Sequence, residues 1–241
     1  MGDIRLALMT GVDIPIPECQ VALHQPTIKE ISMIGEKAFF TGAQVLCVNK
    51  TAYIEDENVL ANTNNFQIFM TIMTDKSTAD KRAEVIDVLT LLFPSYKVNF
   101  TPRALLLNSS NGNVMIDEDN FENLQEVFRQ VFCLSSSNQD TFNPGNEAAK
   151  KIADKLMRAR QRVAAQKGDQ SDASMFGQYL SILTVGLNSM SMNDLMNLTM
   201  YQIYDLIERY HLYVNWDLDV RTRLAGGKPD SSPDNWMKII H

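Results

Sequence analysis

The stretch LSSSNQDTFNPG, residues 134–145, constrains the fold most, because it divides the chain into two parts of different character. It is rich in Ser, Asn, Asp, Pro and Gly, which favour turns and loops. The sequence before it mixes helix and strand patterns, whereas the sequence after it is helical. We therefore predict an α+β, predominantly helical protein with a small mixed N-terminal domain at 1–133, a linker at 134–145, and an all-helical C-terminal domain with an extended tail at 146–241.

The N-terminal part opens with extended sequence and then a helix signal. We expect a strand at IRLALM, residues 4–9, and an extended connection at GVDIPIPEC, residues 11–19, where two prolines restrict the backbone. Thr27 and Glu30 have the spacing of a capping box, in which the Thr hydroxyl accepts from the N–H three residues on and the Glu side chain reaches back. A helix is predicted to begin there, with a buried face made of Ile28, Ile31, Ile34 and Ala38.

Apolar spacing predicts two more helices on either side of a β-hairpin. The first spans Thr78–Phe93, ends before Pro94, and buries Ala79, Ala83, Ile86, Leu89 and Phe93. The hairpin turns at Asn111-Gly112, a pair that accepts the positive dihedrals of tight turns. The second helix begins after Asp117 or Asp119 and buries Phe121, Leu124, Phe128, Val131 and Phe132. Residues 66–73 fit a helix or a strand equally well.

After the linker we expect helices at 146–167, 174–187 and 199–224, the last stopped by Gly226-Gly227. The first of them is unusually basic. Residues 143–168 carry seven Lys or Arg and two Asp or Glu, in a chain whose formal net charge is -7. On a helical wheel, an apolar stripe is flanked by one cationic row, made of Lys151, Lys155, Arg158 and Arg162.

Three interpretations of this cationic row are open. Its long side chains can extend to water or pair with the acidic remainder of the chain. They can also bind an acidic protein partner. Nucleic acid is the least favoured ligand, because affinity for a phosphate backbone depends on neutralising several phosphates at once and a single row supplies few contacts.

Methionine is concentrated between the second and third predicted C-terminal helices. Met is flexible, so it fills irregular gaps in a core, and it also recurs at surfaces that accept varied apolar helices. The candidate partner-binding residues in this region are Met190, Met192, Met196 and Met200.

The sequence offers no combination of residues that we can nominate as a catalytic site, metal site or cofactor site. The three cysteines are far apart and are expected to be reduced and mostly buried, and the three histidines are isolated. A calcium-like loop at 107–118 begins with Leu107 where an oxygen ligand is needed, and AGGKP lacks the remaining residues of a phosphate loop. Asp217 and Asp219 are expected on a solvated helix face. We therefore expect a non-enzymatic protein without a cofactor.

No apolar run approaches the roughly 18 residues of a membrane-spanning helix, and the start of the chain does not resemble a secretory signal. A cytoplasmic protein without membrane association is the expectation.

Four stretches resemble the tail assembly chaperones of long-tailed bacteriophages. They are PTIKEISMIGEKAFF, NGNVMIDEDNFENLQEVF, NPGNEAAKKIADKLMRARQRVAAQKG and NLTMYQIYDLIERYHLYVNWDLDVRTRLAGGKPD. In that family a mixed N-terminal domain precedes a basic helix and a helical region with a short recognisable pattern. Here the pattern consists of Leu198, Thr199, Tyr201, Gln202, Asp205 and Arg209.

The resemblance implies a protein that acts in the host cytoplasm by binding the tape-measure protein and other tail proteins, and that keeps the tape-measure protein soluble during tail assembly. Self-association is a further option. Two alternatives remain: a tail or baseplate component retained in the virion, and a nucleic-acid-binding regulator that uses the basic helix at 146–167.

Overall fold

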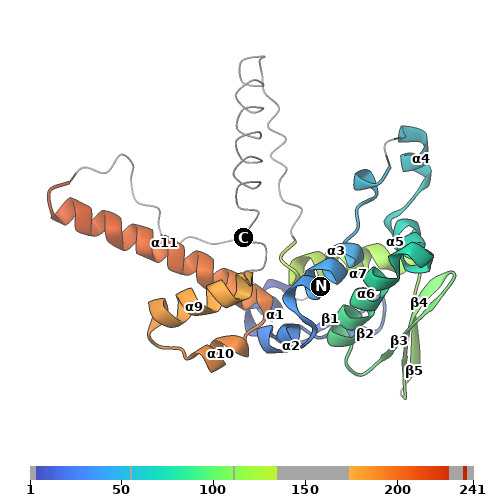
Figure 1. Ribbon diagram of the computed structural model, residues 1–241, viewed down its shortest axis with the longest axis horizontal. Coiled ribbons are helices and arrows are strands. Elements are labelled where there is room, and N and C mark those ends of the chain that lie inside the picture. The colour runs from blue at the N-terminus through green and yellow to red at the C-terminus, as the bar shows by residue number, and fades with distance from the viewer. Residues whose placement is uncertain (1–3, 55, 111, 135–173, 228–235, 238–241) are drawn as a thin grey trace, which may run out of the picture.

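A computed structural model describes residues 4–54, 56–110, 112–134, 174–227 and 236–237 (Figure 1). The expected fold class is confirmed: helices dominate, and both small antiparallel sheets precede the C-terminal helices. The predicted linker after Leu134 and the predicted basic helix at 146–167 lie outside the described residues.

The first element is a helix, so the prediction of a strand at the start of the chain was wrong. Helix α1 spans Ile4–Thr10. Its apolar residues Ile4, Ala7 and Leu8 recur at three and four residues and pack as one face on the core. The extended connection that follows is itself part of a hairpin, in which β1 (Ile14–Ile16) pairs with β2 (Val21–Leu23).

The capping box at Thr27 and Glu30 is confirmed. The Glu30 N–H donates to Thr27 Oγ1 over 3.2 Å, and the Thr27 N–H donates to Glu30 Oε2 over 2.8 Å. The helix that begins there is shorter than expected, because Gly35, at a φ of 90°, separates α2 (Ile28–Ile34) from α3 (Glu36–Leu46). This break turns the chain, so Phe39 takes the buried place predicted for Ala38.

Short elements lead from α3 to the next long helix: η1 (Lys50–Ala52), α4 (Glu57–Asn62), α5 (Asn65–Thr74) and η2 (Lys76–Thr78). The ambiguous apolar stretch is therefore helical, as α5. Its start is fixed by a capping box between Asn64 and Gln67.

Helix α6 (Ala79–Leu92) confirms the predicted helix, but its buried face differs in part from the prediction. Ala83 is exposed. The buried residues are Val85, Val88, Leu89, Leu92 and Phe93. The helix has apolar residues on more than one side, so periodicity alone did not fix which side meets α3.

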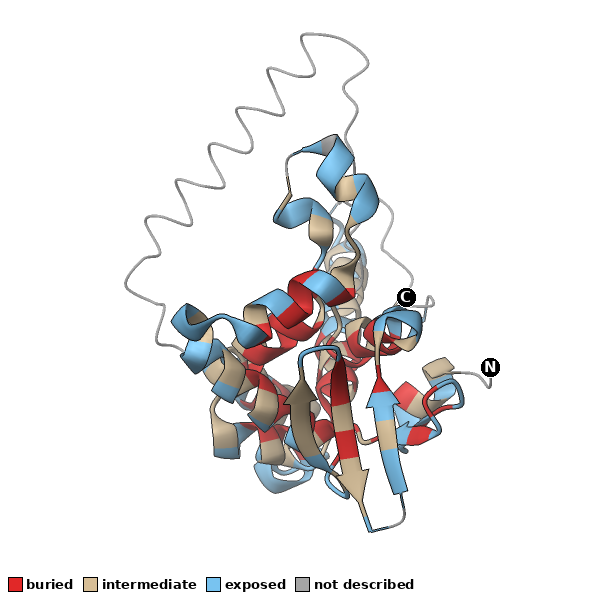
Figure 2. Cartoon of the chain, turned by 90° about the vertical axis from the view of Figure 1, so that its right-hand side faces the viewer, coloured by how far each residue is buried: buried red, intermediate tan, exposed pale blue. Residues whose placement is uncertain are grey.

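The hairpin at residues 104–116 is confirmed and gains a third strand. Strand β4 (Ala104–Ser109) lies between β3 (Lys97–Thr101) and β5 (Gly112–Ile116), with Ser109 opposite Gly112 at the turn. Figure 2 shows that β4 carries most of the buried residues of this sheet, whereas β5 is mostly exposed and is buried only at its last residue, Ile116.

Helix α7 (Glu118–Val131) follows the sheet and is capped by Asp117. Of the two candidate caps, Asp117 holds the cap position, and Asn120 supplies the second half of the capping box. All five residues predicted to be buried along this helix are buried.

The described C-terminal part consists of α9 (Met175–Leu187), the short α10 (Met192–Met196) and α11 (Met200–Leu224). Ser174 caps α9 and Thr199 caps α11, as the predicted starts require. Gly226 follows α11 at a φ of 84°, which confirms the predicted stop.

The C-terminal helices pack on the N-terminal part and share its core. One apolar cluster runs from Leu8 in α1 to Ile207 in α11. Glu36, in the first turn of α3, accepts hydrogen bonds from Ser174 Oγ (2.5 Å) and from the Met175 N–H (2.9 Å). A carboxylate at the N-terminus of α9 is favoured there by the free N–H groups of the first turn.

Candidate functional site

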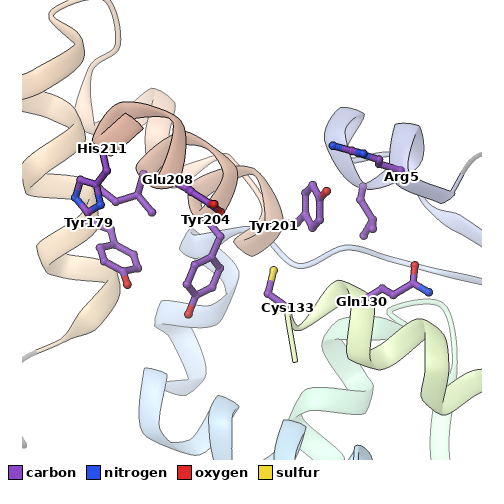
Figure 3. Close-up of a pocket in the computed structure, with 10 residues that line it drawn as sticks. Arg5, Gln130, Cys133, Tyr179, Tyr201, Tyr204, Glu208 and His211 are labelled. Carbon is purple, nitrogen blue, oxygen red and sulfur yellow. The ribbon is translucent and has the colours of Figure 1, made fainter. Parts of the chain in front are cut away.

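A pocket of about 510 Å³ lies where the first and last helices of the described chain meet. Its walls come from α1, the C-terminal end of α7, α9 and α11 (Figure 3). The lining residues are Arg5, Leu8, Gln130, Cys133, Tyr179, Tyr201, Tyr204, Ile207, Glu208 and His211. This volume falls within the usual range of sites for small ligands or large side chains.

One face of α11 supplies half of the lining. Tyr201, Tyr204, Glu208 and His211 follow one another at three, four and three residues, a spacing that stacks side chains along one side of a helix. Across the pocket, Tyr179 meets Tyr204 edge to face, with 5.7 Å between the ring centres. Figure 3 shows these two rings pointing the same way from two different helices.

Tyr201 and Tyr204 present neutral hydroxyl groups to the pocket. Burial is the main cause that raises the pKa of Tyr204. Burial also raises the pKa of Tyr201, although the positive charge of Arg5 acts to lower that pKa. The Tyr204 hydroxyl donates to Met175 Sδ over 3.5 Å. The pocket therefore combines aromatic faces with a few polar tips, an arrangement suited to an apolar group that carries one or two hydrogen-bonding atoms.

The Cys133 thiol in this pocket should be nearly inert toward alkylation in the native protein. Burial raises its pKa to about 12, and raises those of Cys47 and Cys19 to about 12 and about 11. Because only the thiolate reacts, each unit of raised pKa lowers the reactive fraction about tenfold near neutral pH. Timed iodoacetamide labelling, followed by peptide mass spectrometry, measures the rate for each cysteine. Cys133 should react more than about tenfold more slowly in the native protein than in the protein unfolded with guanidinium.

Labelling of Cys133 as fast in the native as in the unfolded protein would contradict the burial of this thiol. Cys19, which lies outside the pocket, serves as the internal reference for general unfolding.

The six-residue pattern that begins at Leu198 and ends at Arg209 lies at the junction of the two parts of the chain. The Leu198 carbonyl accepts a bond from the Ile28 N–H (2.9 Å), and Thr27 forms an antiparallel bridge with Thr199, so two helix caps lie side by side. Gln202 completes the cap of α11 and donates through Nε2 to the Met9 carbonyl over 2.8 Å. This part of the pattern fixes α11 against α1 and α2.

The rest of the pattern follows α11 outward. Tyr201 lines the pocket, and Asp205 is buried in the core beside it. Arg209 Nη1 donates to the Trp236 carbonyl over 2.7 Å, and the Trp236 ring packs edge to face on Tyr213. The pattern thus builds the frame of the pocket and supplies one of its walls.

The predicted partner-binding residues are only partly described. Lys151, Lys155, Arg158 and Arg162 lie outside the described residues. Of the four methionines, Met200 is buried in the core, Met190 and Met196 are partly buried against it, and Met192 is 41% exposed. These methionines do not line the pocket.

The pocket residues from α1, α7 and α9 were not predicted from the sequence. Arg5, Cys133 and Tyr179 come from segments far apart in the chain, and none belongs to a local motif. The spacing of Tyr201, Tyr204 and His211 in α11 was the one available signal, since it places three ring-bearing side chains on one side of a helix.

The isolated histidines take different places. His24 lies between Asp13 (Nδ1 to Oδ1, 3.0 Å) and Glu30 (Nε2 to Oε2, 3.4 Å), and His211 lines the pocket. Asp217 and Asp219 pair with arginines one turn further along α11. Among the described residues, no group of three or more His, Cys, Asp or Glu side chains could hold a metal ion. Within the same ranges, no helix has the length and apolar character needed to cross a membrane.

Residues 167–241 match the family model described as the YomV second domain. The matched stretch contains α9, α10 and α11 and so includes the larger share of the pocket lining. YomV is a phage-related family, and the match suggests a phage protein. No curated protein and no solved structure matches the chain.

Proposed function

We propose that this protein is a tail assembly chaperone of a bacteriophage, which binds the tape-measure protein in the host cytoplasm and keeps it soluble while the tail assembles. It acts by reversible binding, without catalysis or a cofactor. The observation that carries the proposal is the tyrosine-lined pocket between α1, α7, α9 and α11, most of which belongs to the part that matches a phage-related family. The resemblance to tail assembly chaperones gives the class of partner.

The pocket suits an apolar residue projecting from a helix. Helical ligands bind through anchor side chains spaced along one face, and the deepest anchors are large apolar or aromatic residues in desolvated pockets. Tyr179 and Tyr204 offer ring surfaces for such an anchor, and Leu8 and Ile207 are buried beside them. Glu208 and His211 are exposed and can meet polar residues that flank the anchor.

The test is coexpression with the tape-measure protein of the same phage. The wild-type chain should keep that protein in the soluble fraction and copurify with it. Tyr179→Asp should reduce the copurified amount by about tenfold or more, because a carboxylate in the apolar pocket must lose its hydration when an apolar anchor enters. The matched control is Gln178→Asp, which adds the same charge to the neighbouring exposed residue of α9 outside the pocket.

Melting curves of both variants establish that they remain folded. A tape-measure protein that stays insoluble beside the wild-type chain, or that copurifies equally with both variants, would refute the proposed binding site. Mass spectrometry of purified particles addresses the alternative of a tail or baseplate component. A chaperone should be missing or far below stoichiometric amounts, whereas a structural subunit should be present in full.

A further inference from the structure

Helix α11 extends well beyond the body of the protein. It spans 25 residues, but its buried residues all lie in the first eight, ending at Ile207. Figure 1 shows its C-terminal half projecting past α9. From Glu208 to Leu224 no residue of the helix is buried among the described parts of the chain.

A seam of side chains, apolar except at Asp217 and Arg221, nevertheless continues along this projecting half. The side chains of the seam repeat alternately at four and three residues, which is the spacing that packs one helix along another. They are Ile203, Ile207, Tyr210, Val214, Asp217, Arg221 and Leu224. Leu218 lies beside the seam.

The inner part of the seam is covered and the outer part is not. Ile203 and Ile207 lie in the core, and Tyr210 packs so closely on Gly186 of α9 that a β-carbon on that glycine would lie 2.4 Å from the ring. Beyond this contact, Val214 is 39% exposed and Leu224 is 83% exposed. The exposed seam thus continues an interface that the helix already forms with α9.

The seam carries one charged pair between its apolar residues. Arg221 Nε lies 2.8 Å from Asp217 Oδ2, and both positions fall between Val214 and Leu224. Asp217 and Arg221 are equally far from residue 219, and so are Val214 and Leu224. An antiparallel copy of the same helix, centred on residue 219, therefore brings each member of a pair next to the other member of that pair. Val214 then meets Leu224 of the second copy, and Asp217 meets Arg221 of the second copy.

We propose that the projecting half of α11 is a dimer interface, in which two copies of this chain pair antiparallel about a twofold axis near Asp219. A parallel arrangement would place Asp217 beside Asp217 and Arg221 beside Arg221, and like charges at a helix interface disfavour pairing. The antiparallel arrangement also places the two bodies at opposite ends of the shared segment.

The interface is separate from the pocket. The exposed part of the seam, from Val214 to Leu224, lies beyond the pocket, whose lining on α11 ends at His211. Tyr213 and Trp216 pack against Trp236 beside the seam. About 15 residues per copy overlap, or roughly 22 Å of helix at 1.5 Å per residue. Such a small contact predicts a weak dimer with a dissociation constant of about 1–100 µM.

Sedimentation velocity over a concentration series tests the dimer with the full chain. The wild type should pass from monomer to dimer, and Val214→Glu/Leu224→Glu should raise the dissociation constant more than tenfold. Both residues are exposed in the monomer, so circular dichroism should be unchanged. The matched control is Met33→Glu/Val185→Glu, which adds two charges at exposed apolar residues off the seam and should dimerise like the wild type.

Disulfide trapping tests the direction of pairing. An equimolar mixture of Val214→Cys and Leu224→Cys chains should give covalent dimers on air oxidation, whereas each variant alone should give few. Covalent dimers from Val214→Cys alone would instead show parallel pairing and overturn the register. A wild type that remains monomeric up to about 200 µM, well above the expected range, would overturn the dimer. If the wild type is monomeric and binds the tape-measure protein, whereas the Val214→Glu/Leu224→Glu variant does not bind it, the seam binds the partner instead of a second copy.

Discussion

Gln125→Leu should lower the free energy of unfolding by about 2–5 kcal/mol, although Leu has nearly the same volume as Gln. Gln125 is fully buried in α7. Its Nε2 donates to the carbonyls of Leu46 (3.0 Å) and Val48 (2.8 Å), and its Oε1 accepts from Asn65 Nδ2 (3.0 Å) and Arg129 Nη2 (2.6 Å). Leu removes all four bonds and leaves two buried carbonyls without this donor.

Urea unfolding followed by circular dichroism measures the effect. Asn123→Leu, at an exposed position of the same helix, controls for placing Leu in α7 and should change the free energy of unfolding by less than about 0.5 kcal/mol. If both variants unfold at the same urea concentration, Gln125 does not join α7 to the end of α3 in the way its four hydrogen bonds indicate.

Elements with local signals could be predicted from the sequence. The cap at Thr27 predicted one helix start, because a side chain that satisfies a free N–H acts within one turn. The predicted starts at 174 and 199 coincide with the caps Ser174 and Thr199 of the structure. The turn at Gly112 likewise fixed the hairpin. These signals depend on residues close together in the chain, so distant packing does not alter them.

Features that depend on distant partners could not be predicted. Helix α1 is only seven residues long, and its apolar sequence fits a strand until α11 is placed beside it. The buried side of α6 is chosen by α3, and the pocket exists only where α1, α7, α9 and α11 converge. The pattern around Thr199 and Gln202 has a structural role that the sequence did not reveal, because its cap and bridge join the two parts of the chain.

Gly42→Val should be the most damaging single substitution in the contact between α3 and α6. A β-carbon at Gly42 would lie 2.7 Å from the Glu84 carbonyl oxygen and 2.7 Å from Val88 Cγ2. The carbonyl belongs to the backbone of α6, so the two helices must move apart and loosen the core around Phe39. We expect a loss of about 3 kcal/mol or more, because overpacking in a core costs about 1–3 kcal/mol and Val adds two more carbons to the clash.

The alanine variant separates close packing from helix propensity. Ala favours a helix over Gly by about 1 kcal/mol, so Gly42→Ala would stabilise the protein if the site had room, and should destabilise it if the helices touch there. Gln44→Val, at an exposed position of α3, measures the cost of a β-branched residue alone, expected below about 1 kcal/mol. Thermal unfolding of the three variants should rank Gln44→Val as most stable and Gly42→Val as least stable. A Gly42→Ala protein more stable than the wild type would show that α3 and α6 do not meet at this glycine.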